Sequence, residues 1–324
     1  MKSKLIRNGL FVLLIPALIM AMLAGCANLP AANAPAGNPE TSADTADAPA
    51  AEQGPIRVAS KDFTEQFILG EMYALLLENA GYQVERKINL GGTPIAQQAL
   101  INNEIDLYPQ YTGTGLLTVL QMPVMNDPQA VYDTVKQAYE EQFQLTWLDP
   151  APMNNTQALA MTQERATELG ITTISEMAAV ADQLVLVGPP EFAEREDGLP
   201  GLQGAYGDFE FANFLAVDPG LRYQAIVNGE ADVTVAFGTD GELAAYNLVT
   251  LEDDQNLWPP YQVAPVVRQE LLTAQPEVAT VLNALAPLLT DDTMRQLNNQ
   301  VSGESQEPAD VARAFLVDQG LIEQ

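Results

Sequence analysis

The sequence predicts an α/β protein of two similar lobes that face one another. Residues 103–107 and 229–233 share one pattern, in which a helix ends, an acidic turn follows and a short apolar strand begins. Each strand leads to an aromatic residue and a Gly/Thr loop, at residues 111–115 and 237–241. Ligands of open α/β sheets bind at the carboxyl ends of strands, so both lobes would offer an aromatic side chain and a polar loop to one cleft. Chance repetition of a common turn is the alternative. The length of 324 residues also favours two lobes, because one core rarely organises more than about 250–300 residues.

Strand and helix patterns alternate after residue 55, as a largely parallel sheet requires. Asp62, with Glu65 three residues later, forms a variant of the capping box, and an apolar helical face begins at Phe63. Thr93 as cap and Pro94 at the first helical position open another helix. Strands are expected at residues 55–60, 83–88, 107–111 and 145–148, and a further helix at 127–143.

Two proline-rich breaks mark where the chain is expected to cross between lobes, at residues 150–156 and 253–260. Between them the pattern predicts a strand at residues 184–187, Gly-rich turns at 198–207, a helix at 221–228, and strands at 233–237 and 247–251. After the second break it predicts a strand at residues 261–267 and helices at 276–289, 290–299 and 308–319. The first lobe would therefore comprise residues 55–156 and 258–324, and the second lobe residues 157–257. Two crossings between lobes form a hinge.

The N-terminus has the anatomy of a secretory signal over residues 1–25. A basic start precedes an apolar run at residues 10–23 that is too short to span a bilayer comfortably. Residues 23–26 resemble the bacterial lipobox, which implies that Cys26 is lipidated and becomes the mature N-terminus outside the cytoplasm; an uncleaved anchor is the alternative. Residues 26–54 have scarcely a large apolar side chain and are expected to be a flexible tether.

Composition excludes several classes of function. The net charge is -29 with only 14 basic residues, which argues against nucleic acid as a partner. The chain has no histidine, so Ser-His-Asp and Cys-His catalysis and the commonest zinc sites are excluded. The single cysteine excludes an internal disulfide. The acidic pairs at residues 253–254 and 291–292 lack the pattern of a calcium loop. We therefore expect no metal and no cofactor.

Six short motifs support a family resemblance that extends from residue 56 to the C-terminus. They occupy residues 60–66, 108–115, 154–156, 195–198, 239–241 and 259–261. Because these motifs follow one another in the family's order and approximate spacing, the chain resembles the osmoprotectant-binding proteins of ABC importers, which capture glycine betaine, choline, carnitine and related solutes. The resemblance implies a periplasmic-binding-protein-like fold of type II with the ligand between the lobes. It also implies a monomeric, lipid-anchored extracytoplasmic receptor that delivers its ligand to an ABC permease and is not an enzyme.

The chemistry of such ligands dictates the residues that hold them. A quaternary ammonium has no N–H to donate, so the faces of aromatic rings attract it instead, at about 0.5–2 kcal/mol each. A ligand carboxylate requires Lys or Arg and hydroxyl donors. The resemblance assigns carboxylate positions to Lys61, Thr114 and Arg195, and cage positions to Tyr111, Gln157, Phe237 and Tyr261.

The chain departs from the family pattern at two cage positions, Gln157 and Phe237, where the family usually has tyrosine. Phe237 keeps a ring face, whereas Gln157 makes one wall of the cage polar. Either neighbours such as Tyr108 or Phe192 compensate, or the ligand is another zwitterion, such as an amino acid or a larger betaine.

A surface hydrolase that uses paired carboxylates is a more distant alternative. The candidate pairs are Glu65 with Glu71 and Asp106 with Asp240. These acids already fit cap and turn positions, and the chain has no Gly-x-Ser-x-Gly nucleophile motif.

Overall fold

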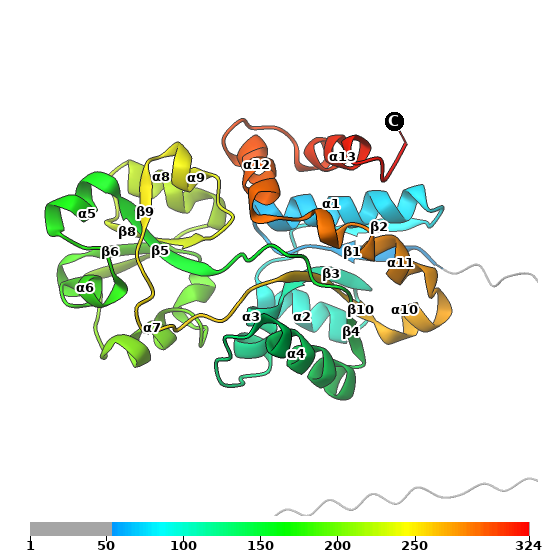
Figure 1. Ribbon diagram of the computed structural model, residues 1–324, viewed down its shortest axis with the longest axis horizontal. Helices are drawn as coiled ribbons and strands as arrows, with labels where there is room; N and C mark the ends of the chain where they lie inside the picture. Colours follow the sequence, from blue (N-terminus) through cyan, green and yellow to red (C-terminus); the bar gives the residue numbers. More distant parts are fainter. Residues whose placement is uncertain (1–53, 324) are drawn as a thin grey trace, which may run out of the picture. The chain divides into compact units, whose positions relative to one another are not determined.

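The structure is a computed structural model that describes residues 54–323. The predicted signal peptide, Cys26 and all but the last residue of the predicted tether lie outside the described residues. Within the described range, no helix is both long enough and apolar enough to cross a membrane. Two five-stranded sheets and the helices around them make up the fold (Figure 1).

The first lobe is built on a sheet with strand order β2-β1-β3-β10-β4. Its strands are β1 (Ile56–Ala59), β2 (Val84–Lys87), β3 (Leu107–Tyr111), β4 (Leu145–Trp147) and β10 (Val263–Arg268). β1 is parallel to β2 and β3, whereas β10 is antiparallel to β3 and β4. The helices of this lobe are α1 (Thr64–Asn79), α2 (Thr93–Ile101), α3 (Thr112–Thr114), α4 (Pro128–Phe143), α10 (Gln269–Ala274), α11 (Glu277–Asn283), α12 (Asp291–Ser302) and α13 (Pro308–Asp318). α1 packs against α11, α12 and α13, and Figure 1 shows α2 and α4 on the other side of the sheet.

The second lobe repeats this plan with strand order β7-β6-β8-β5-β9. Its strands are β5 (Gln157–Thr162), β6 (Val185–Gly188), β7 (Asn213–Ala216), β8 (Val233–Phe237) and β9 (Leu248–Thr250). β6 is parallel to β7 and β8, and β5 is antiparallel to β8 and β9. Its helices are α5 (Gln163–Leu169), α6 (Ile174–Ala178), α7 (Leu199–Tyr206), α8 (Arg222–Val227) and α9 (Glu242–Ala245). The predicted α/β architecture with two lobes is confirmed.

The two acidic turns that the sequence repeats form the same contacts in both lobes. Asp106 accepts a hydrogen bond from the backbone N–H of Arg57 at 2.8 Å and donates its own N–H to the carbonyl of Arg57 at 2.9 Å. Asp232 makes the matching pair with Val185, at 3.0 and 2.9 Å. Each acid thereby joins the strand that follows it, β3 or β8, to a parallel neighbour.

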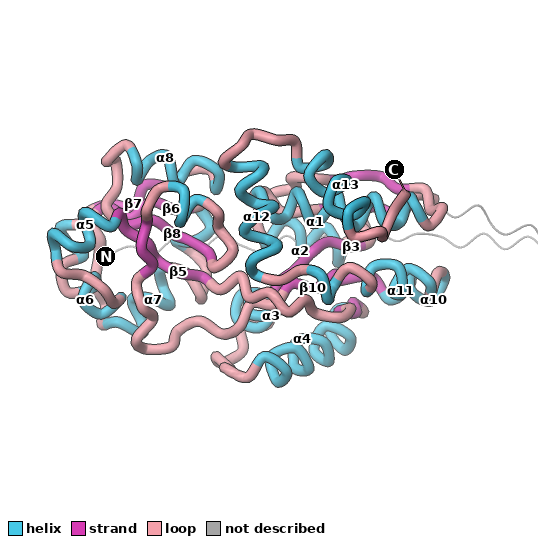
Figure 2. Tube along the Cα trace, turned by 45° about the horizontal axis from the view of Figure 1, so that its top comes forward, coloured by secondary structure: helices cyan, strands magenta, loops and turns pink. Residues whose placement is uncertain are grey.

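Two connections, β4 to β5 and β9 to β10, link the lobes (Figure 2). They are hydrogen-bonded to each other, because Asn155 donates its N–H to the carbonyl of Tyr261 at 3.1 Å and Tyr261 donates its N–H to the side chain of Asn154 at 2.7 Å. The exact lobe boundaries at residues 156 and 257 stay a prediction.

Several local predictions were wrong or incomplete. The predicted cap Thr93 is the first residue of α2, whose N-cap is Gly92. α1 begins at Thr64 with Phe63 as its N-cap and no side-chain cap, so Asp62 does not cap this helix. The segment expected to be Gly-rich turns at residues 198–207 forms α7 instead, which ends at Gly207 with φ of 99°. The strand β5 went unrecognised, although it pairs with both β8 and β9.

Candidate ligand-binding pocket

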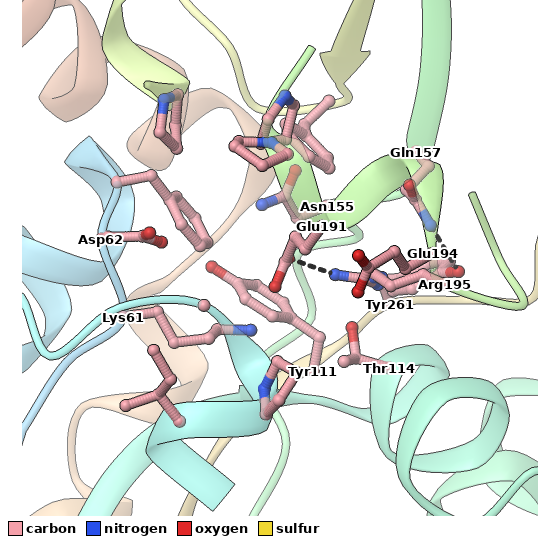
Figure 3. A pocket seen from close by; sticks show the side chains of 18 residues that line it. Lys61, Asp62, Tyr111, Thr114, Asn155, Gln157, Glu191, Glu194, Arg195 and Tyr261 are labelled. Carbon is pink, nitrogen blue, oxygen red and sulfur yellow. Dashed lines mark hydrogen bonds and ion pairs between the residues drawn. The ribbon is translucent and has the colours of Figure 1, made fainter. Parts of the chain in front are cut away.

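Residues from both lobes line a pocket of about 380 Å³, which falls within the roughly 300–1,000 Å³ typical of small-molecule sites. β3 and β8 end at this pocket with Tyr111 and Phe237, the aromatic residues of the two repeated motifs. Figure 3 shows the labelled side chains around the pocket. All seven residues predicted to bind ligand are in its lining: Lys61, Tyr111, Thr114, Gln157, Arg195, Phe237 and Tyr261.

Three nearly parallel rings form the aromatic part of the lining. Phe63 lies with its centroid 6.2 Å from that of Tyr111 at an interplanar angle of 23°, and 6.2 Å from that of Phe237 at 13°. These distances are typical of offset-stacked aromatic pairs. Phe63 therefore contacts one ring from each lobe. Its extended backbone, with φ of -141° and ψ of 160°, sets it outside the helix that follows.

Protein cations already contact these rings. The Nζ atom of Lys61 lies 4.9 Å from the ring centroid of Tyr111 and 5.6 Å from that of Phe63. It donates hydrogen bonds to Gln110 at 3.0 Å and Thr93 at 3.3 Å. Burial lowers the pKa of Lys61 to about 7, although the charge of Glu191 opposes the shift.

Arg222 places its guanidinium 5.2 Å from the ring centroid of Phe237. The same guanidinium forms an ion pair with Asp240 at 2.6 Å, with a side chain that is only 6% exposed. A ligand cation would therefore share Phe237 with a fixed charge of the second lobe.

Asp197 organises the polar wall of the pocket. Both of its carboxylate oxygens accept hydrogen bonds from Arg195, at 2.7 and 2.6 Å, which is a bidentate ion pair. Asp197 also accepts hydrogen bonds from the hydroxyl groups of Tyr261 at 2.8 Å and Thr118 at 3.1 Å. Burial alone would raise the pKa of Asp197, but the charge and hydrogen bonds of Arg195 outweigh it and hold that pKa below its ordinary value.

Gln157 faces the pocket with its amide already bound to the protein. Its Nε2 donates to the carboxylate of Asp197 at 2.8 Å and to the hydroxyl of Tyr261 at 3.1 Å. Neither of the aromatic residues considered as compensation lines the pocket: Tyr108 is hydrogen-bonded to Gln97 and Gln110, and Phe192 is buried in the core. The additional ring in the lining is Phe63.

Thr114 is buried at the pocket wall, and its hydroxyl forms no side-chain hydrogen bond with any other described residue. A hydroxyl in that situation can serve a ligand as donor or acceptor.

Glu191 connects the two lobes across the pocket, and Figure 3 shows its contact with Arg195. One carboxylate oxygen accepts a hydrogen bond from Arg195 at 2.8 Å. The other accepts a hydrogen bond at 3.0 Å from the backbone N–H of Thr93, the first residue of α2. The second lobe thus satisfies a donor at the N-terminus of a helix in the first.

Glu65 is only 3% exposed and accepts four hydrogen bonds. Their donors are the Tyr111 hydroxyl at 2.7 Å, the Asn155 amide at 2.8 Å, the Thr239 hydroxyl at 2.5 Å and the Asn298 amide at 2.9 Å. Burial raises the pKa of Glu65, and the hydrogen bonds from Thr239, Tyr111 and Asn298 oppose that shift. One carboxyl group therefore ties a pocket ring to a lobe connection and to the second lobe.

The other acids considered for hydrolysis have structural partners. Glu71 pairs with Arg86 at 2.8 Å, and Asp106 pairs with both Arg57 and Arg268. Across the described range, no group of acidic or cysteine side chains is arranged to hold a metal ion.

Sequence reasoning missed Phe63, Asn155 and Glu191 as pocket residues. Phe63 and Asn155 belong to motifs that carry the family resemblance, at residues 60–66 and 154–156, so proximity to Lys61 and Gln157 was an available signal. Glu191 follows the strand β6 in a loop of two prolines, and no local pattern distinguishes it from Glu194.

Comparison with known proteins identifies the family. The model of the substrate-binding domain of the ABC-type glycine betaine transport system matches residues 54–318. The glycine-betaine-binding protein of Pseudomonas aeruginosa (strain PAO1) is 37% identical over 278 residues, which cover 83% of this chain and 89% of that protein. The ergothioneine transport permease/ergothioneine binding protein EgtU of Helicobacter pylori (strain G27) is 35% identical over 273 residues, 84% of this chain but only 49% of that protein. This chain thus matches about half the length of the Helicobacter relative.

Solved structures agree with the predicted architecture. A crystal structure described as a glycine betaine/carnitine/choline ABC transporter superposes with a TM-score of 0.65 at 31% identity, over 82% of this chain and 99% of that one. A choline binding protein of an ABC transporter in complex with choline has the same fold, with a TM-score of 0.63 at 18% identity over 82% of this chain and 89% of that one. The chain belongs to the family of substrate-binding domains of ABC-type glycine betaine transport systems.

Proposed function

We propose that this protein is an extracytoplasmic receptor that binds glycine betaine or a related quaternary ammonium solute between its lobes and delivers it to an ABC permease. The observation that carries the proposal is the convergence of three rings, Phe63, Tyr111 and Phe237, with Lys61 and Arg195 around one pocket. A receptor of this kind only needs enough differential affinity to favour the closed state. We therefore propose no catalytic activity.

The pocket offers distinct surroundings for the two ends of such a ligand. The ammonium would lie against the faces of Tyr111 and Phe63, and the carboxylate would lie toward Arg195, Lys61 and the free hydroxyl of Thr114. Micromolar affinity requires about 8 kcal/mol. Ring contacts of about 0.5–2 kcal/mol each, charge-assisted hydrogen bonds and lobe closure together reach that value.

A larger betaine is the second candidate, and the polar wall at Gln157 favours it. Listeria and Helicobacter relatives are named for carnitine and ergothioneine, which carry a quaternary ammonium together with a bulkier polar group. The Gln157 amide, held by Asp197 and Tyr261, would present its remaining oxygen to such a group.

Cys26 is proposed to anchor the receptor, as a monomer, to the outer face of the cell membrane through a lipid. The support is the lipobox-like sequence at residues 23–26 after a short apolar run. Mass spectrometry of the cell-derived protein should find Cys26 acylated and Cys26→Ala unmodified. An unmodified Cys26 would refute the anchor.

Calorimetric titration of the purified full chain tests the proposed ligand class. Glycine betaine, choline, carnitine and ergothioneine are compared with proline, which lacks the quaternary centre. We expect micromolar binding of at least one quaternary ammonium ligand and much weaker binding of proline. The fluorescence of Trp258 gives an independent signal, because its indole N–H donates to the carbonyl of Asp197 at 2.8 Å. Absence of binding for all four quaternary ammonium ligands would reject the proposal.

The same titration repeated between pH 6 and pH 8.5 reports on the protonation of Lys61, because burial lowers the pKa of this residue to about 7. A bound carboxylate favours the charged lysine, so affinity for glycine betaine should fall as the pH rises above 7. A bound choline disfavours the charged lysine, so its affinity should rise over that range. Glu191, Arg195, Asp62 and Asp197 also act on Lys61 electrostatically. Identical pH profiles for the two ligands would place the carboxylate of glycine betaine away from Lys61.

A further inference from the structure

The charges that line the pocket favour a cation over a carboxylate. The lining contains two basic residues, Lys61 and Arg195, and three acidic residues, Asp62, Glu191 and Glu194. Arg195 is moreover neutralised by Asp197 behind it, whose carboxylate binds two of its nitrogen atoms. The third nitrogen, Nη1, donates to Glu191. The guanidinium that would bind a ligand carboxylate is therefore already engaged by two carboxylates of the protein.

Glu191 occupies a position suited to a ligand carboxylate. Its oxygens lie 2.8 Å from Nη1 of Arg195 and 3.0 Å from the N–H of Thr93. A guanidinium together with the N-terminus of a helix is a favourable environment for an anion. α2 has nine residues, and its N-cap, Gly92, supplies no side-chain cap.

Gly92 makes this approach possible. A Cβ atom at that position would lie 2.1 Å from Oε2 of Glu191, and the next two atoms that it would meet also belong to Glu191. The backbone of Gly92, with φ of -66°, is ordinary for any residue. The glycine is therefore needed for space beside the Glu191 carboxylate and not for its backbone conformation.

We propose that Glu191 is a specificity-determining residue that competes with the carboxylate of a ligand for Arg195 and the N-terminus of α2. Its negative charge disfavours carboxylated ligands such as glycine betaine and favours purely cationic ones such as choline. This inference rests on the proposed function, because it concerns which quaternary ammonium ligands the same pocket selects.

Glu191→Gln tests the inference with the smallest change of shape. Glycine betaine should bind about tenfold more tightly, which corresponds to about 1.4 kcal/mol, and choline should bind several-fold more weakly. The ratio of the two dissociation constants is the quantity to compare with wild type. Glu191 also links the lobes, and any loss of closure affects both ligands alike and cancels in that ratio. Glu191→Ala should shift the ratio in the same direction, and circular dichroism verifies that each variant is folded.

Glu194→Gln is the matched control. Glu194 lines the same pocket three residues along the same loop, and it forms no ion pair within the described part of the chain. The ratio should change less than about threefold in this variant, which separates the bridging position of Glu191 from the general loss of one negative charge.

The results of these titrations distinguish failure of this inference from failure of the proposed function. If the wild-type protein binds none of glycine betaine, choline, carnitine and ergothioneine, the proposed function fails and this inference fails with it. If it binds carnitine or ergothioneine but neither glycine betaine nor choline, the function stands and this inference is overturned. If the wild-type protein binds both ligands but Glu191→Gln and Glu191→Ala weaken the binding of both by the same factor, the proposed function stands. Glu191 would then only hold the two lobes together. A shift of the ratio of dissociation constants in Glu194→Gln as large as that in Glu191→Gln would also contradict the proposed competition between Glu191 and a ligand carboxylate.

Discussion

Asp197→Ala is expected to lower the free energy of unfolding by about 3–5 kcal/mol, because it leaves the guanidinium of Arg195 buried without its main partner. The Asp197 side chain is 0% exposed and accepts hydrogen bonds from Arg195, Tyr261, Gln157 and Thr118. Ligand binding should be lost as well, since these donors would reorganise the polar wall of the pocket. Urea denaturation followed by circular dichroism measures the change.

Two further variants show whether charge burial causes the loss. The double change of Arg195→Met with Asp197→Ala removes both charges and should recover much of the stability. Asp292→Ala is the control, because Asp292 pairs with Arg295 at 3.0 Å with a side chain that is 88% exposed, and such pairs contribute about 0–1 kcal/mol. A loss below about 1 kcal/mol for Asp197→Ala would contradict the assigned role.

The sign of the pH dependence follows from the lowered pKa of Asp197. A carboxyl group that is more acidic in the folded state stabilises the fold above its ordinary pKa of about 3.9. That contribution is lost as the pH falls through the lower pKa of the folded state. The difference in stability between wild type and Asp197→Ala should therefore shrink toward acid pH.

The fold was predictable where a local pattern carries the information. β3 and β8 coincide with the strands expected at residues 107–111 and 233–237, because apolar runs between an acidic turn and a glycine loop are unambiguous. The same logic placed Tyr111 and Phe237 at one cleft. β5 was missed because Asn154, Asn155 and Thr156 break the pattern directly before it, and its pairing comes from strands far along the chain.

Glu65 and Phe63 show why the rest could not be derived locally. Glu65 stands three residues after Asp62, which is the spacing of a capping box, yet its carboxylate binds Thr239 and Asn298, which lie 174 and 233 residues away in sequence. The position of Phe63 matches the helical period of α1, yet an extended backbone turns its ring to the cleft. In both cases a tertiary contact overrides a local preference.

Arg195 illustrates a different limit. The family resemblance marks the residue, and Asp197 is in the same motif at residues 195–198. Only the structure shows that Asp197 is buried and engages the guanidinium through both oxygens. Whether an arginine is free to bind a ligand depends on such burial, which sequence spacing does not encode.

Phe63→Leu is expected to weaken the binding of glycine betaine and of choline equally, by about 100-fold or about 2.7 kcal/mol. The substitution removes one ring face for the ligand cation, at about 0.5–2 kcal/mol, and two stacked ring pairs, at about 0.5–1.5 kcal/mol each beyond their buried area. Those pairs hold Tyr111 of the first lobe and Phe237 of the second in nearly parallel planes. Calorimetric titration with both ligands measures the effect.

Equal loss for both ligands is the diagnostic feature, because the quaternary ammonium is the group that they share. Phe63→Tyr should retain most of the affinity, since it keeps the ring. Phe143→Leu is the control for deleting a ring elsewhere: Phe143 packs edge-on against Tyr139 with centroids 5.2 Å apart, and it does not line the pocket. If Phe63→Leu binds both ligands within about threefold of wild type, the ligand cation does not lie on this ring. The cation would then have to be held by Tyr111, Phe237 or Tyr261 without the ring that joins the two lobes.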